Sequence, residues 1–308
     1  MARIGVRGGA GADALRRITV NDVSLAYREV GSGDAVVFVH GGVSDLRTWA
    51  GQLEPIGTRA RAIAYSRRYA WPNDDITPGA ADPMSPHVDD LVALLHVLDA
   101  SPAHLVGNSW GGLICLLTAV RHPEVVRSLV LEEPPLLPLV LGAGPRPRPG
   151  TLVSSLVRRP RATLAALVVG VRTFAPMAWA HRRGDEEHAW RVFARGVLGR
   201  DAVARLTPER EQQMRDNASL LRAELRAGFP PLSEADVQAI DAPTLLVSGG
   251  RSPAVVTALS DWLPSLVRQA RQVRVPDASH LVHEDDAPFV NALVLDFISD
   301  LGERRSGG

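Results

Sequence analysis

The sequence predicts an α/β fold in which a mostly parallel central sheet carries helices on both faces. Three observations lead to this prediction: short apolar runs rich in β-branched residues, helical segments that alternate with them, and uninterrupted apolarity inside the runs. Strands that are covered on both faces lack the alternation of apolar and polar residues that a half-exposed strand shows. Alternation of strand and helix along a chain favours parallel strands joined by right-handed crossovers.

Six of the apolar runs are expected to form the strands of this sheet. They occupy residues 35–40, 60–66, 103–108, 126–132, 243–249 and 271–276. Helix-like periodicity follows at residues 87–100, 111–122, 252–267 and 285–301. Upstream of the sheet, residues 18–28 alternate about the turn pair Asn21-Asp22, which predicts a small hairpin.

One long interruption divides this pattern. Residues 136–235 show helical periodicity and Arg-rich faces, and we interpret them as a helical cap inserted into a core of residues 17–135 and 236–303. Residues 1–16 are interpreted as a flexible tail. Between Leu136 and Asp236 there are 16 Arg against 10 Asp plus Glu, a surplus of 6, whereas the whole chain has 34 basic and 34 acidic residues. The inserted segment therefore presents a surface distinct from the core.

The composition of the chain narrows its partners. Balanced charge gives no reason to expect nucleic acid or an anionic membrane, and no run approaches the about 20 apolar residues of a membrane span. The single cysteine, Cys115, lies in an apolar run and cannot form an internal disulfide, which fits a buried residue in a reducing cytoplasm. We expect a soluble, cytoplasmic protein whose partner is a small molecule. The sequence does not indicate its oligomeric state.

A serine between two glycines is the first candidate for chemistry. Ser109 stands two residues from both Gly107 and Gly111, after a predicted strand and before a predicted helix. This G-x-S-x-G pattern is typical of a nucleophile elbow, a sharp turn that exposes the serine while small residues let strand and helix approach. A purely structural glycine turn gives the same pattern, so the interpretation depends on partners elsewhere in the chain.

An oxyanion site is predicted beside this serine. The strand that ends at His40 is followed by two glycines, and a turn there can aim the backbone N–H of Gly42 at a developing oxyanion. The second donor would be the backbone N–H of Trp110, directly after the serine. The alternative is that the glycines only turn the chain.

A histidine in the C-terminal part completes the pattern. His280 follows the last predicted strand, so it would emerge at the carboxyl edge of the sheet as a general base. His283 is the alternative, but it lies nearer the following helix. With FVHGG, GNSWGG and PDASHLVHEDDAP in place, residues 17–303 resemble α/β-hydrolase-fold enzymes with an inserted cap. The resemblance implies the order serine, acid, histidine, and we expect neither a metal nor a cofactor.

The carboxylate expected to pair with the histidine departs from the pattern of the superfamily. Many members carry an aspartate as G-x-x-D-P after the seventh strand, but the matching stretch LLVSGGRSP has Ser252 there, and a serine cannot stabilise an imidazolium by charge. The preceding strand ends in Glu132 and Glu133. Some haloalkane dehalogenases place a glutamate after this strand, and the resemblance favours Glu133. Only one of the pair should face the histidine, because successive strand residues point to opposite sides; Glu132, or no acid from this pair, stays open.

The serine nucleophile narrows the chemistry. Dehalogenases and cap-bearing epoxide hydrolases attack with an aspartate, and the tyrosines of this chain, Tyr27, Tyr65 and Tyr69, all precede the predicted cap. An activated serine suits acyl transfer. We therefore predict a serine hydrolase of esterase or lactonase type that forms an acyl-enzyme with a small to medium apolar substrate. The alternatives are a C–C bond hydrolase or non-hydrolytic cyclase using the same site, and a non-catalytic ligand receptor.

Substrate contacts are expected from residues near these motifs. Aromatic side chains could wall an apolar pocket, and an arginine after the strand at 60–66 could bind a carboxylate or another substrate oxygen. The candidate substrate-binding residues are His40, Gly41, Trp49, Arg67, Phe174 and Trp179.

Overall fold

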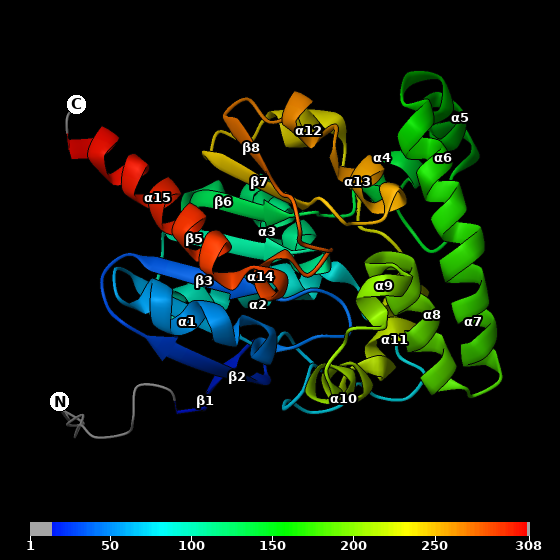
Figure 1. The fold of residues 1–308 in the computed structure, drawn as a ribbon, viewed down its shortest axis with the longest axis horizontal. Coiled ribbons are helices and arrows are strands. Elements are labelled where there is room, and N and C mark those ends of the chain that lie inside the picture. Colours follow the sequence, from blue (N-terminus) through cyan, green and yellow to red (C-terminus); the bar gives the residue numbers. More distant parts are fainter. Residues whose placement is uncertain (1–13, 307–308) are drawn as a thin grey trace.

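The computed structural model describes residues 14–306. It contains an eight-stranded sheet with helices on both faces, which confirms the predicted fold class (Figure 1). Of the predicted tail, residues 1–13 lie outside the described residues, and its last residue, Arg16, belongs to the first strand.

The sheet has the strand order β1-β2-β4-β3-β5-β6-β7-β8. The strand β1 pairs antiparallel with β2, as does β2 with β4, whereas all later neighbours are parallel. The six strands predicted downstream of the hairpin all form, each within a residue of the expected ends. The strands are β1 (Arg16–Val20), β2 (Val23–Val30), β3 (Ala35–Val39), β4 (Arg61–Tyr65), β5 (Ala103–Asn108), β6 (Val126–Glu132), β7 (Thr244–Gly249) and β8 (Ala270–Val275).

Two apolar cores cover the two faces of the sheet. Alternate residues of β3 enter each: Val37 belongs to the cluster that includes apolar side chains of α2 (Met84–Val97), α3 (Trp110–Arg121) and α12 (Glu234–Gln238), while Phe38 belongs to the cluster that includes those of α1 (Ala50–Gly57) and α15 (Ala287–Ser306). Burial on both faces is the reason for the continuous apolarity of the strands. The strands β1 and β8 are the exceptions, since each lies at an edge of the sheet and exposes several residues.

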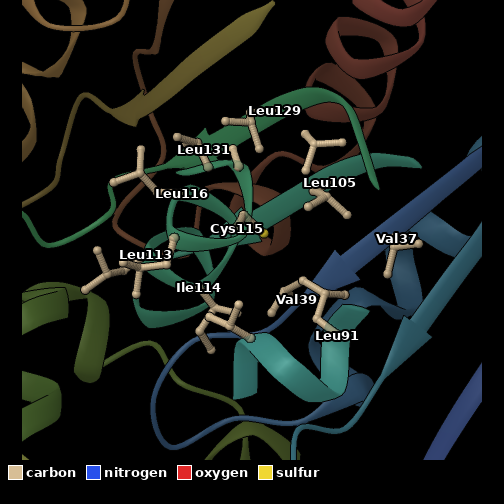
Figure 2. Packing of buried hydrophobic residues seen from close by; sticks show 14 of the residues in the cluster. Val37, Val39, Leu91, Leu105, Leu113, Ile114, Cys115, Leu116, Leu129 and Leu131 are labelled. Carbon is tan, nitrogen blue, oxygen red and sulfur yellow. The ribbon is translucent and has the colours of Figure 1, made fainter. Parts of the chain in front are cut away.

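The helix α3 is held deep in the first core. Figure 2 shows Leu113 and Cys115 of α3 gathered with Val39 of β3, Leu105 of β5 and Leu131 of β6. Burial raises the pKa of the Cys115 thiol, which keeps it protonated. This packing fixes the start of α3, and with it the residue that precedes the helix.

Helices fill the chain between β6 and β7, at one end of the sheet (Figure 1). We refer to residues 137–227 as the helical insertion. Its helices are α4 (Leu137–Leu141), α5 (Pro149–Arg158), α6 (Pro160–Val169), η3 (Gly170–Phe174), α7 (Ala175–Arg182), α8 (Glu186–Leu198), α9 (Arg200–Val203), α10 (Pro208–Asp216) and α11 (Ala218–Ala227). The next helix, α12, straddles the predicted boundary at residue 235 and packs on α3 of the core layer.

The elements α6, η3 and α7 run on as one helix, Pro160–Arg182. By length and composition alone it is the one described helix apolar enough to cross a membrane, although 39% of its most apolar window is buried inside the protein. It packs against α13 (Ala254–Ser260) and α8. Such packing is typical of a helix inside a folded domain.

One helical prediction needed correction. The segment 252–267 forms only α13 and the short η4 (Leu263–Ser265), because Pro264 lacks the N–H that a longer helix requires. The helix predicted at 285–301 forms as α15, which begins two residues later and is preceded by the short α14 (Val282–Asp285). The short η1 (Leu46–Trp49) and α1, which follow β3, were not predicted.

Candidate active site

Ser109 occupies a tight turn between β5 and α3. Its backbone has φ 51° and ψ −118°, a left-handed conformation that a non-glycine residue adopts only when its surroundings enforce it. Its N–H donates to the carbonyl of Glu132 at 2.8 Å, and its own carbonyl accepts from Leu113 at 3.1 Å. The serine is therefore held at the carboxyl edge of the sheet by the strand beside it and the helix after it.

The flanking glycines allow this turn. A Cβ on Gly111 would lie 2.1 Å from the carbonyl oxygen of Val39, and one on Gly107 would lie 2.7 Å from the carbonyl oxygen of Gly111. Real Cβ atoms do not approach backbone so closely, so both positions require glycine.

Gly111→Ala is expected to destabilise the protein by about 3 kcal/mol or more, because β3 must move to admit the methyl group. Urea unfolding followed by circular dichroism measures the change. The matched control is Gly150→Ala in α5, where nothing lies within 4 Å of the new Cβ and a gain of up to about 1 kcal/mol is expected. Equal stability of the two variants would contradict this account of the elbow.

His280 pairs with Glu133. The Nδ1 of His280 donates to Oε2 of Glu133 at 2.6 Å, and both side chains are buried. A proton held on Nδ1 leaves Nε2 as the basic nitrogen, the arrangement that a general base needs.

Three further hydrogen bonds fix Glu133 where β6 ends. Its Oε1 accepts from the Gly249 N–H at 3.0 Å, its Oε2 accepts from the Ser252 hydroxyl at 2.8 Å, and its own N–H donates to the Val247 carbonyl at 3.2 Å. Its φ of 45° is left-handed, so the strand end is bent to place this carboxylate. Ser252, the residue at the usual aspartate position, therefore holds the Glu133 carboxylate in place. This contact was not predicted from the sequence.

Ser252→Ala is expected to lower kcat/KM against esters about tenfold at neutral pH, because it removes one hydrogen bond to a carboxylate. Ser252→Thr keeps the hydroxyl and should stay near wild type. An unchanged rate in Ser252→Ala would show that the hydroxyl plays no part.

The neighbouring glutamate makes a separate buried pair. Glu132 Oε2 accepts from Nδ1 of His283 at 2.6 Å and from the Asn108 side chain at 3.2 Å. The ring of His283 is stacked on Trp49, with centroids 3.9 Å apart, and its Nε2 bonds to the Thr48 hydroxyl at 2.9 Å. His283 is thus packed on the α1 face of the sheet, whereas His280 is not.

Ser109, His280 and Glu133 all line one cavity of about 270 Å³ beneath the helical insertion. Most of its lining is apolar, with residues from α4, α8, α11 and α13. The apolar side chains include Leu137, Leu141, Phe174, Met177, Phe193, Leu221, Phe229 and Leu259. No cluster of three or more metal-ligating side chains occurs among the described residues.

The predicted oxyanion residues, Gly42 and Trp110, also line this cavity. The turn before Gly42 is fixed from behind: the Gly41 carbonyl accepts from His40 Nδ1 at 2.9 Å and from Arg67 Nη2 at 3.1 Å. The Nε2 of His40 accepts from the Arg67 N–H at 2.9 Å. Burial, and then the Arg67 charge, hold the pKa of His40 well below its usual range, so the ring is neutral. Both nitrogens of His40 are therefore engaged in supporting the turn.

Several predicted substrate contacts needed correction. Phe174 lines the cavity, but Trp49 does not: it is fully buried on the other side of the turn, against His283 and Phe38. Trp179 is 53% exposed and covered by the Arg183 guanidinium rather than facing the cavity.

The polar candidates lie behind the cavity wall. His40, Gly41 and Arg67 are absent from the lining, and the Arg67 side chain is fully buried. They support the turn through the bonds described above. The prediction that these residues contact substrate directly needs correction, because the packing of the turn places them outside the cavity lining.

Glu224 of α11 lines the cavity and was not among the predicted site residues. Its carboxyl group is buried and accepts from Arg67 Nη2 at 3.2 Å. Burial raises the pKa of Glu224 to about 7, although the Arg67 guanidinium opposes the shift. No local pattern distinguishes this glutamate from others on the Arg-rich helices, so only the fold reveals it.

Comparison with known proteins agrees with this geometry. A family model described as the alpha/beta hydrolase fold matches residues 34–287. The chain belongs to this family. The alpha/beta hydrolase fold accounts for the sheet order, the elbow and the helices on both faces.

Two curated hydrolases match part of the chain. It is 29% identical over 125 residues to the uncharacterized hydrolase YraK of Bacillus subtilis (strain 168), covering 41% of this chain and 46% of that protein. It is 30% identical over 118 residues to 2-hydroxymuconate semialdehyde hydrolase of Pseudomonas sp. (strain CF600), covering 38% and 42%. Each of these two matches spans less than half of the relative.

A solved structure extends the likeness to the whole fold. A thermophilic esterase from Thermogutta terrifontis superposes with a TM-score of 0.66 at 22% identity, covering 94% of this chain and 99% of the esterase. Identity at this level demonstrates a shared fold and leaves the substrate open.

Proposed function

We propose that this protein is a serine hydrolase of esterase or lactonase type, acting on a small to medium apolar substrate. The observation that carries the proposal is the pairing of His280 with Glu133 in an apolar cavity that Ser109 also lines. The helical insertion would act as the cap over this cavity. A cytoplasmic location is part of the same proposal and is supported by the buried, unpaired Cys115.

The proposed mechanism uses an acyl-enzyme. His280 Nε2 takes the proton of the Ser109 hydroxyl as its oxygen attacks the substrate carbonyl, and Glu133 stabilises the imidazolium. The backbone N–H groups of Gly42 and Trp110 donate to the oxyanion. His280 then protonates the leaving alcohol, and the same base activates the water that releases the acid.

The size of the cavity predicts the preferred chain length. About 270 Å³ is at the lower end of the volumes of small-molecule sites. We expect p-nitrophenyl esters of two to about six acyl carbons to be hydrolysed best, and kcat/KM to fall at least about tenfold by twelve carbons because the longer chain cannot be buried. A series of such esters, with a lactone series beside it, measures this. A steady rise with chain length would contradict an enclosed acyl site.

Carbon–carbon bond hydrolysis is the second candidate. It is favoured by the 30% identity to 2-hydroxymuconate semialdehyde hydrolase, and it would employ the same serine and histidine. A vinylogous keto acid that absorbs in the near ultraviolet distinguishes the two: its colour is lost only if the bond beside the ketone is broken. Turnover of this compound without turnover of any ester or lactone would favour the second candidate.

A further inference from the structure

A second buried carboxyl group faces the cavity and has no part in the proposed acyl transfer. Glu224 lines the cavity and is 8% exposed. Its Oε1 takes the hydrogen bond from Arg67, while its Oε2 lies 3.7 Å from the point that a Cβ on Gly42 would occupy. One oxygen of this carboxyl group is therefore directed to the turn that is predicted to hold the oxyanion.

The apolar surroundings of Glu224 make it costly in free energy to ionise a carboxyl group at this position. Apart from the proposed triad and the indole of Trp110, the cavity is lined by apolar side chains and glycines. A carboxyl oxygen that faces such a space has few protein donors around it, and a hydrogen-bond donor on a ligand would supply one. A buried ionisable group in a cleft is for this reason a candidate for binding.

We propose that Glu224 is a polar subsite that binds a hydroxyl group of the substrate close to the scissile carbonyl, and so selects hydroxylated esters or lactones over their plain analogues. This inference rests on the proposed function. A hydroxyl suits the subsite better than an ammonium group, because the Arg67 guanidinium already lies against the carboxylate. The positive charge of Arg67 would repel an ammonium group. A neutral hydroxyl forms a charge-assisted hydrogen bond with the carboxylate and is not repelled.

The ionisation of Glu224 gives the subsite a pH dependence. Burial raises its pKa to about 7; the Arg67 charge opposes this shift and the Asp82 carboxylate adds to it. Asp82 is in turn bonded to His87 at 3.0 Å. The carboxylate, which accepts from a hydroxyl, therefore forms as the pH rises through about 7. The preference for hydroxylated substrates should increase from pH 6 to 8, and any pH effect common to both reactions cancels in the ratio of two substrates.

The test compares ethyl hexanoate with ethyl 2-hydroxyhexanoate and ethyl 3-hydroxyhexanoate in a pH-stat. Wild type should prefer one hydroxylated ester about ten- to hundredfold in kcat/KM at pH 8. In Glu224→Gln the preference should fall below about fivefold and lose its pH dependence, because a neutral amide makes a weaker bond and does not titrate. Glu209→Gln, on the exposed start of α10, is the matched control and should behave as wild type.

Two results would overturn the proposal while leaving ester hydrolysis intact: equal rates on all three esters in wild type, or an unchanged ratio in Glu224→Gln. Absence of any hydrolysis would count against the proposed function instead. In that case calorimetry on Ser109→Ala with the same esters decides, since binding needs no chemistry. Tighter binding of a hydroxylated ester that is lost in Ser109→Ala/Glu224→Gln supports the subsite, and equal binding of all three refutes it.

Discussion

Ser109→Ala is expected to reduce kcat/KM against short p-nitrophenyl esters by at least about 10⁴-fold. The variant has no hydroxyl to attack the carbonyl, while the cavity and the predicted oxyanion donors remain. The fold should be unchanged, because the hydrogen bonds that fix the turn are made by the Ser109 backbone. The rate is measured spectrophotometrically and folding is checked by circular dichroism.

Ser154→Ala, in the partly exposed helix α5, is a matched control for the loss of a serine hydroxyl. It should retain wild-type activity. Ester turnover that survives in Ser109→Ala would mean that another group, or a contaminating enzyme, performs the reaction. Turnover that is lost equally in the control would point to a general effect on the preparation.

Glu133→Gln has the second largest expected effect, a loss of about 10³ to 10⁴ in kcat. The variant keeps the shape of the side chain but removes the negative charge that lies 2.6 Å from His280 Nδ1. The amide can also turn its NH₂ group to the ring, which favours the tautomer with the proton on the wrong nitrogen. Steady-state kinetics of the folded variant measure the loss.

Glu132→Gln is the matched control for this substitution. It changes the adjacent residue, whose partner is His283, so activity should stay within about tenfold of wild type. The free energy of unfolding should fall by about 1 to 3 kcal/mol, because the buried hydrogen bond to His283 is weakened. A second check is Ser252→Asp in the Glu133→Gln background, which returns the acid to the position usual in the superfamily and should regain at least about tenfold. Equal losses in the two glutamine variants would contradict the assignment of the acid.

The sheet was predictable from sequence because its strands are buried on both faces. The continuous apolarity of β3, β5 and β7 reflects this burial directly, and each strand is within a residue of its expected bounds. The elbow was also predictable, since a Cβ at Gly107 or Gly111 would clash with backbone. Such positions leave a local signal that needs no knowledge of distant contacts.

The features of the site that were not predicted depend on contacts between segments that are distant in the sequence. Ser252 lies 119 residues from Glu133 in the sequence, and its hydroxyl gains a role only because the ends of β6 and β7 are adjacent. Arg67 and Glu224 are 157 residues apart, and their pairing requires the helical insertion to fold over the turn after β3. Trp49 was assigned to the cavity because it follows that turn, but η1 places it in the core on the α1 face of the sheet.

The most direct test of the central claim is covalent labelling by a fluorophosphonate probe, followed by mass spectrometry of the intact chain and of its peptides. The account predicts one probe per chain, attached to Ser109, with a labelling rate that falls at least about a hundredfold in Glu133→Gln and little in Glu132→Gln. A wild-type chain that takes up no probe at Ser109 would contradict the claim that His280 and Glu133 activate this serine.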